Sequence, residues 1–197
     1  MKNLYILFVI LISFYGCNET TENSDKIFES KPIKINQDIK KEEDIIENFS
    51  IKNQRDLSIK IAISNEKLIV KRRKESIVLI NIFSSWCKPC MGQIPYLAEI
   101  QKRENKDLLI IGINNNDNKT KKELNNIFEV SGIRYFISTD TNNTKLVNKI
   151  LKQLKLKNNF KIPLSIIYKN GKLYRYYEGT MPMEMLHTEI KNAKKLL

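Results

Sequence analysis

Residues 77–90 read IVLINIFSSWCKPC and join a short apolar run to two closely spaced cysteines. The opening run is rich in β-branched residues, which is typical of a strand buried on both faces. After the second cysteine, apolar residues recur at helical spacing from Ile94 onward. The pattern therefore predicts that Cys87 and Cys90 lie where a buried strand ends and a helix begins.

Cys87 and Cys90 stand three residues apart on the first turn of this predicted helix, so a disulfide forms with little rearrangement. The positive end of the helix dipole favours the thiolate of Cys87, and Lys88 adds to that effect. Pro89 lacks an N–H that the first turn does not use, and its fixed φ suits helix initiation. We expect an exposed Cys87 to attack a partner disulfide and a more buried Cys90 to resolve the mixed disulfide.

Two cysteines at this spacing also occur in zinc sites, but zinc normally takes four ligands. The chain offers one such pair and a single distant histidine, His187. That histidine adjoins the apolar stripe of the last predicted helix, and we interpret it as a partly exposed structural residue. We therefore expect neither a metal nor a cofactor.

The net charge of the 197-residue chain is +12, which raises the question of an acidic partner. Basic residues are spread along the chain, however, and the run from Lys71 to Lys74 has no interleaved aromatic side chain that would stack on a base. We interpret the run as a solvated loop and expect no nucleic-acid partner.

The rest of the domain alternates strands with helices and ends in a hairpin and a helix. Asn170-Gly171 suits the tight turn of that hairpin, and alternating apolar residues between Phe49 and Val70 predict a further hairpin before the first long strand. The expected strands are Ile77–Phe83, Leu108–Ile113, Tyr135–Ser138, Leu164–Tyr168 and Lys172–Tyr177, and the later helices cover about Thr120–Val130, Lys145–Leu154 and Met183–Leu197. These elements predict an α/β fold in which helices cover both faces of a mixed sheet.

The first residues predict export. A positive start and the apolar stretch Leu4–Phe14 have the form of a secretory signal and are too short to span a bilayer comfortably. Gly16-Cys17 resembles a bacterial lipoprotein cleavage site, at which Cys17 receives a lipid and becomes the new N-terminus. An uncleaved anchor is the alternative, and both interpretations place the remaining chain outside the cytoplasm at a membrane surface. The expected divisions are a signal peptide at 1–17, a polar tether at 18–48 and a folded domain at 49–197.

Together these residues resemble the thioredoxin superfamily, and more closely its membrane-tethered TlpA/ResA-like thiol-disulfide oxidoreductases. The resemblance covers about Ile77–Leu197 and rests on the strand, Trp86, the cysteine pair, Pro95, and Ile162-Pro163 before an Asn-Gly hairpin. It implies a thioredoxin-like three-layer α/β/α sandwich. It also implies a cis bond before Pro163, substrate docking along the backbone of Ile162, and a surface beside Cys87 shaped by Trp86. The alternatives are a trans-proline and core packing of the indole.

Two positions depart from the family pattern. Thioredoxin keeps a buried aspartate where this chain has Asn81, and many ResA-like members keep a glutamate where it has Gln93. The side-chain amides of Asn81 and Gln93 neither gain nor lose a proton near neutral pH. The proton acceptor for Cys90 therefore stays unassigned.

The resemblance implies a reductase of disulfides in other exported proteins, located in the periplasm or at the cell surface and kept reduced by a membrane-embedded thiol donor. Apocytochrome c is a client by family analogy alone. Lys88 favours the opposite direction, oxidation of clients, because it stabilises the reduced thiolate. A non-enzymatic thioredoxin-like binding module is a third interpretation, motivated by the two missing acidic residues.

Overall fold

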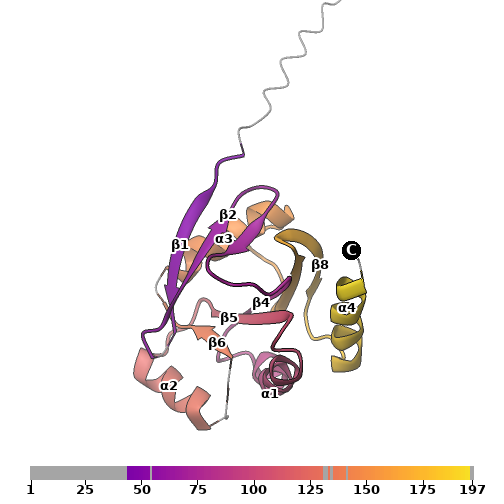
Figure 1. Cartoon of the computed structure of the whole chain (residues 1–197). Coiled ribbons are helices and arrows are strands. Elements are labelled where there is room, and N and C mark those ends of the chain that lie inside the picture. Colours follow the sequence, from indigo (N-terminus) through magenta and orange to yellow (C-terminus); the bar gives the residue numbers. More distant parts are fainter. Residues whose placement is uncertain (1–43, 54, 131–132, 134, 141, 196–197) are drawn as a thin grey trace, which may run out of the picture. The chain divides into compact units, whose positions relative to one another are not determined.

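Strand β4 (Ile77–Phe83) lies in the middle of a five-stranded sheet, with helices outside it (Figure 1). The structure is a computed structural model that describes residues 44–53, 55–130, 133, 135–140 and 142–195. The predicted signal peptide and residues 18–43 of the predicted tether lie outside the described residues. None of the described helices has the length and apolar character needed to cross a membrane. The elements in chain order are β1 (Glu47–Lys52), β2 (Ser58–Ile63), β3 (Leu68–Val70), β4 (Ile77–Phe83), α1 (Lys88–Arg103), β5 (Leu108–Asn114), α2 (Lys121–Val130), β6 (Phe136–Ser138), α3 (Asn143–Leu154), β7 (Leu164–Lys169), β8 (Lys172–Glu178) and α4 (Met183–Lys195).

The central sheet has the strand order β6-β5-β4-β7-β8. Strand β4 runs parallel to β5, and β5 runs parallel to β6, whereas β7 is antiparallel to both β4 and β8. Strands β4 and β5 are buried along their whole length, as their nearly continuous apolar runs predicted. The predicted mixed sheet is confirmed, and the predicted strands and helices form within two residues of their expected ends.

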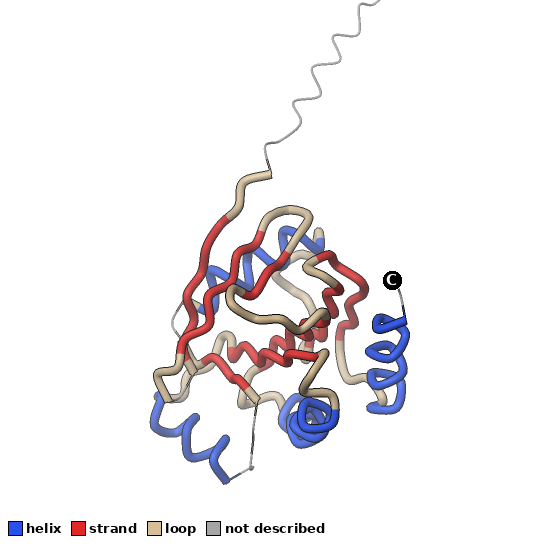
Figure 2. The backbone as a smooth tube through the Cα atoms, viewed as in Figure 1, coloured by secondary structure: helices blue, strands red, loops and turns tan. Residues whose placement is uncertain are grey.

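The sheet separates two apolar cores. Side chains of β4 alternate between them, so that Leu79 joins the core shared with α1, α2 and α4, and Ile80 joins the core shared with α3 and β1–β3. Figure 2 shows the helices outside the strands. The three-layer arrangement implied by the family resemblance is therefore confirmed.

The predicted N-terminal hairpin is present and gains a third strand. Strands β1, β2 and β3 form a separate antiparallel sheet, in which Ile61 is the partner of Val70. The N–H of Leu68 donates to the carbonyl of Gly171 at 2.8 Å, in the turn between β7 and β8. Asn170 and Gly171 both have positive φ, as the tight hairpin turn requires.

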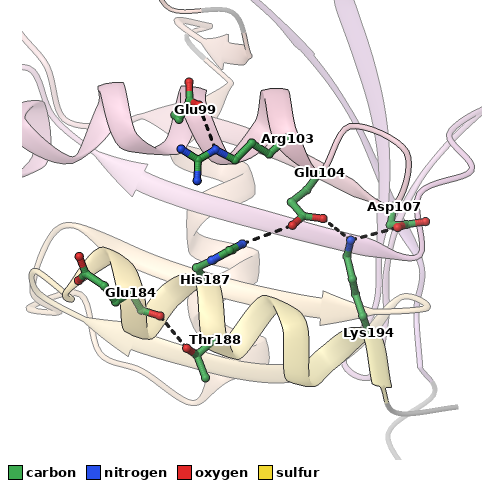
Figure 3. A network of polar contacts seen from close by, with 8 residues as sticks. All are labelled: Glu99, Arg103, Glu104, Asp107, Glu184, His187, Thr188 and Lys194. Carbon is green, nitrogen blue, oxygen red and sulfur yellow. Dashed lines mark hydrogen bonds and ion pairs between the residues drawn. The ribbon is translucent and has the colours of Figure 1, made fainter.

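Helix α4 is held to the end of α1 by a group of charged side chains (Figure 3). Lys194 donates to the carboxylates of Glu104 and Asp107, and His187 Nε2 lies 3.3 Å from Glu104 Oε1. The pKa of Glu104 lies below its ordinary value, chiefly because Lys194 donates a hydrogen bond to the carboxylate. His187 is partly exposed and contacts Glu104, in agreement with its interpretation as a partly exposed structural residue.

Candidate active site

The two cysteines lie at the carboxyl end of the central strand. Strand β4 ends at Phe83, and helix α1 begins at Lys88 with Cys87 as its N-cap. A disulfide joins Cys87 to Cys90, with an Sγ–Sγ distance of 2.06 Å and a Cα–Cα distance of 5.2 Å. The N–H of Cys90 donates to Cys87 Sγ at 3.3 Å. The predicted position of the pair, between a strand end and a helix start, is confirmed.

The two cysteine residues differ little in exposure. Cys87 is 7% exposed and Cys90 is 1% exposed, so Cys87 is the more accessible of the two. The prediction of an exposed Cys87 is wrong for the disulfide form, because both residues belong to the apolar core between α1 and the sheet. Lys88 and Pro89 are the exposed residues of this turn. The start of α1 still favours negative charge on Cys87 once the disulfide is reduced.

Trp86 forms part of the surface next to Cys87. The residue is 61% exposed, and its indole N–H donates to the carbonyl of Asn116 at 3.0 Å. Core packing of Trp86, the alternative left open by the sequence, is therefore wrong. The hydrogen bond fixes the polar edge of the ring and leaves much of its apolar surface facing solvent.

The loop before Cys87 is held by residues that follow β5, which the sequence analysis did not identify. Ser84 Oγ donates to the carbonyl of Asn115 at 2.5 Å, and the N–H of Ser85 donates to Asp117 Oδ2 at 2.6 Å. Partial burial of Asp117 opposes ionisation, but the hydrogen bonds that the carboxyl accepts, including those from the N–H groups of Ser85 and Lys119, together outweigh it and lower its pKa. The sequence carried one signal for this contact, a polar run directly after a buried strand parallel to β4.

Ile162 and Pro163 lie at the same end of the sheet as the cysteines. Their peptide bond is cis, which confirms the prediction. They precede β7, whose first residue, Leu164, pairs with Ile82 near the end of β4. Ile162 is partly buried and packs against the core cluster that includes both cysteines, while Pro163 is buried. The topology therefore brings together the two motifs that the sequence identified about 75 residues apart.

Asn81 and Gln93, the two amides at the positions that depart from the family pattern, are in contact. Asn81 comes from β4 and Gln93 from the second turn of α1, and both are buried. Asn81 Nδ2 donates to Gln93 Oε1 at 3.5 Å and to Ser165 Oγ, from β7, at 3.2 Å. The polar side chains of Asn81, Gln93 and Ser165, which lie on the core side of the cysteine turn, are therefore all uncharged.

The remaining predictions about the site concern a metal and a lipid. Within the part of the chain that the structure describes, no group of three or more His, Cys, Asp or Glu side chains is placed to hold a metal ion. Cys17, the predicted lipidation site, lies outside the described residues.

Comparison with known proteins agrees with this geometry. The sequence model of the redoxin family matches residues 57–197, which is more than half of the chain. Thioredoxin-like protein YneN of Bacillus subtilis is 34% identical over 59 residues, which cover 30% of this chain and 34% of YneN. This chain spans between 34% and 57% of the length of the curated relatives that it matches.

Solved structures of similar fold include thiol-disulfide exchange proteins. A thioredoxin-family thiol:disulfide interchange protein from Chlorobium tepidum has a TM-score of 0.56 at 19% identity, over 74% of this chain and 92% of that one. The exposed lipoprotein thioredoxin Etrx1 of Streptococcus pneumoniae has a TM-score of 0.51 at 16% identity, over 74% of this chain and 99% of that one.

At these identities the structural likeness establishes the fold, and the matched family model establishes descent. The chain belongs to the redoxin family, as a thioredoxin-fold member that resembles the TlpA/ResA-like thiol-disulfide oxidoreductases.

Proposed function

We propose that this chain reduces disulfides of other exported proteins through the dithiol of Cys87 and Cys90. The thiolate of Cys87 attacks one sulfur of the client disulfide and releases the other as a thiolate. Cys90 then attacks Cys87 Sγ, the bond between Cys87 and the client breaks, and the client leaves fully reduced. Two electrons and two protons pass to the client, and the chain is left with the Cys87–Cys90 disulfide.

The observation that carries the proposal is the position of the disulfide, at the N-terminus of α1 and at the same sheet end as Ile162-Pro163. The helix start supports a reactive thiolate on Cys87. The backbone of Ile162, directly before β7, would offer a client segment a hydrogen-bonding partner beside the disulfide, and the exposed ring of Trp86 would offer it an apolar surface. Lys88 and Pro89 tune this turn through charge and fixed φ.

The proposed location is the outer face of a membrane. The signal-like segment that ends at Cys17 supports export and a lipid anchor, and similarity in fold to an exposed lipoprotein of Streptococcus pneumoniae is consistent with it. A membrane-embedded thiol donor would return the chain to its dithiol form, and apocytochrome c is one candidate client. Cys17→Ala should move the protein from the membrane fraction to the soluble fraction. Retention at the membrane would instead indicate an uncleaved anchor.

The equilibrium redox potential of the cysteine pair tests the direction of electron flow. The full chain is equilibrated in defined thiol buffers, alkylated and weighed by mass spectrometry. A midpoint at or below about −250 mV supports a reductant, whereas one near about −120 mV makes the chain an oxidant of exported proteins. If no reversible disulfide forms at all, the oxidoreductase proposal fails.

Cys87→Ser separates an enzyme from a binding module. An oxidoreductase loses all turnover with this variant, because no thiolate remains to start the exchange. A module that only holds a partner beside Ile162-Pro163 keeps its partner and its affinity. Insulin reduction followed by turbidity measures the first property, and co-purification of partners with the purified variant measures the second.

A further inference from the structure

Three buried polar side chains form a cluster beside the cysteine turn, and we call Asn81, Gln93 and Ser165 the amide cluster. Asn81 is 1% exposed, Gln93 is 3% exposed and Ser165 is fully buried. They come from β4, α1 and β7, the three elements that meet next to the disulfide. Gln93 lies one helical turn after Cys90, and Asn81 points to the face of β4 that shares a core with Cys90.

The hydrogen bonds inside the amide cluster leave two polar atoms without a partner. Asn81 Oδ1 and Gln93 Nε2 are buried and make no hydrogen bond within the described protein. One is an acceptor and the other is a donor, so a group that satisfies both must donate and accept. Asn81 Oδ1 and Gln93 Nε2 share their amide carbons with the two atoms that are hydrogen-bonded to each other. They are therefore close enough for one water molecule, or two in a chain, to bridge them. Buried polar groups without a protein partner are the sites where internal water is held.

Proton transfer is required at this place. When Cys90 resolves a mixed disulfide, its S–H bond breaks and a new bond forms to Cys87 Sγ. The bond between Cys87 and the client breaks in the same step, and the client leaves with that electron pair as a thiolate. The amide cluster contains no carboxylate that would accept the proton of Cys90. Its amides and its hydroxyl do not take up protons near neutral pH.

The charged groups around the turn lie elsewhere. Lys88 on α1 is exposed, Asp117 is bonded to Ser85 on the loop before Cys87, and Glu178 on β8 accepts a hydrogen bond from the N–H of Lys161. In the core cluster that contains Cys90, the titratable side chains besides the cysteines are tyrosines, and burial raises the pKa of Tyr135. None of these groups belongs to the amide cluster.

We propose, on the basis of the function proposed above, that Asn81 and Gln93 bind internal water next to Cys90 and that this water accepts the Cys90 proton in the resolving step. The water takes up the Cys90 proton as it hands one of its own to solvent, so no hydronium ion forms in the core and the proton lost by Cys90 ends in bulk water. Asn81 and Gln93 are thus positioning residues, which act through the water that they hold.

The chromogenic disulfide dithiobis(nitrobenzoate) separates the two steps in the reduced full-length protein. Attack by Cys87 releases the first equivalent of thionitrobenzoate, and attack by Cys90 releases the second. Asn81→Leu and Gln93→Met each remove one of the two polar anchors at similar side-chain size. We expect each to slow the second release at least about tenfold, because each variant keeps one of the two anchors and so loses only part of the roughly 10²- to 10⁴-fold that a positioned proton acceptor contributes, and to leave the first within about twofold.

Gln101→Met is the matched control on the same helix. Gln101 is partly buried, and both polar atoms of its amide are hydrogen-bonded. Its Nε2 donates to the carbonyl of Leu108 at 2.8 Å, and its Oε1 accepts the N–H of Ile110 at 2.6 Å. Its loss removes two hydrogen bonds between α1 and β5 without touching the amide cluster. Both releases should keep their wild-type rates, which separates a general loosening of α1 from loss of the water.

Asn81→Asp distinguishes proton transfer from packing. The new carboxylate accepts the Cys90 proton directly, so the second release should exceed the wild-type rate above the pKa of that carboxyl and show an added inflection in its pH profile. A packing role alone predicts a rate at or below wild type at every pH. The proposal is overturned if Asn81→Leu and Gln93→Met both leave the second release within about twofold of wild type, or if Asn81→Asp is no faster. Absence of the first release in the wild-type protein would instead refute the proposed function.

Discussion

Replacing Asp117 tests whether the loop after β5 holds the loop before Cys87. Asp117→Ala removes the carboxylate that accepts the N–H of Ser85 at 2.6 Å and the N–H of Lys119 at 3.1 Å. A hydrogen bond to a charged group contributes about 1.5 to 3 kcal/mol to stability. Asp117 is only partly buried and water replaces part of the loss, so we expect the lower end, about 1.5 to 2 kcal/mol. For a domain of this size that corresponds to a fall in Tm of roughly 3 to 8 °C.

The effect of Asp117→Ala should depend on pH in a defined direction. The pKa of Asp117 is lowered in the folded protein, so the carboxylate stabilises the fold fully above the ordinary aspartate pKa of about 3.9. That contribution is lost as the pH falls through the lower, folded pKa. The difference between wild type and variant should therefore be constant near neutral pH and shrink in strong acid.

Urea unfolding followed by far-UV circular dichroism measures the free energy of unfolding, and fluorescence of Trp86, the single tryptophan, reports on the loop itself. Asp56→Asn is the control, because Asp56 pairs with Lys121 on the exposed surface, such pairs contribute little, and Asn tolerates the positive φ of this position. An Asp117→Ala variant with wild-type stability, unchanged Trp86 emission and no altered pH dependence would refute the proposed restraint of the loop.

Three further predictions concern the core, the order of attack and the contact between α1 and α4. Phe128→Ala should lower the free energy of unfolding by about 3 to 5 kcal/mol in urea titrations, because the buried ring packs edge-on against Phe83, with centroids 6.0 Å apart. A loss near zero would mean that this core has no tight packing there. Cys90→Ser should trap mixed disulfides between Cys87 and clients on non-reducing gels, and if none accumulate, the order of attack is wrong. Glu104→Gln should lower Tm near neutral pH, because the lowered pKa of Glu104 makes its ionised form stabilising; the difference should begin to shrink below the ordinary glutamate pKa and vanish once the pH is below the lowered pKa of the folded protein. A difference that persists in acid would contradict this reasoning.

The elements around the disulfide were predictable because their signals are local. Three signals lie within about 25 residues: an apolar run interrupted only by Asn81, the two cysteines, and apolar residues at helical spacing. Periodicity was therefore enough to predict where the cysteine turn lies. The hairpin at Asn170-Gly171 was predictable for the same reason, since both turn residues need positive φ. The cis bond before Pro163 came from the family resemblance and not from any local pattern.

Contacts between distant segments were not predictable in this way. The restraint of Ser85 by Asp117 joins residues about 30 positions apart and depends on β4 and β5 being parallel neighbours, which no local pattern specifies. The low exposure of Cys87 depends on how α1 packs on the sheet, whereas the sequence analysis considered only the position of Cys87 at a helix start. The contact between Asn81 and Gln93 likewise required β4 and α1 to be placed side by side.

The small sheet of β1, β2 and β3 shows that the folded domain extends beyond the segment that matches the redoxin family. The redoxin match begins at residue 57, after β1 has ended. Strand β1 nevertheless contributes Ile51, which is fully buried, and the carbonyl of Lys52 accepts the N–H of Thr139 beyond the end of β6. A fragment cut at the family boundary would expose the apolar surface beneath β1 and leave β2 with an open edge, which invites aggregation. Proteins of this kind should therefore be compared along the family segment but expressed, truncated or fused only with the strand that precedes it.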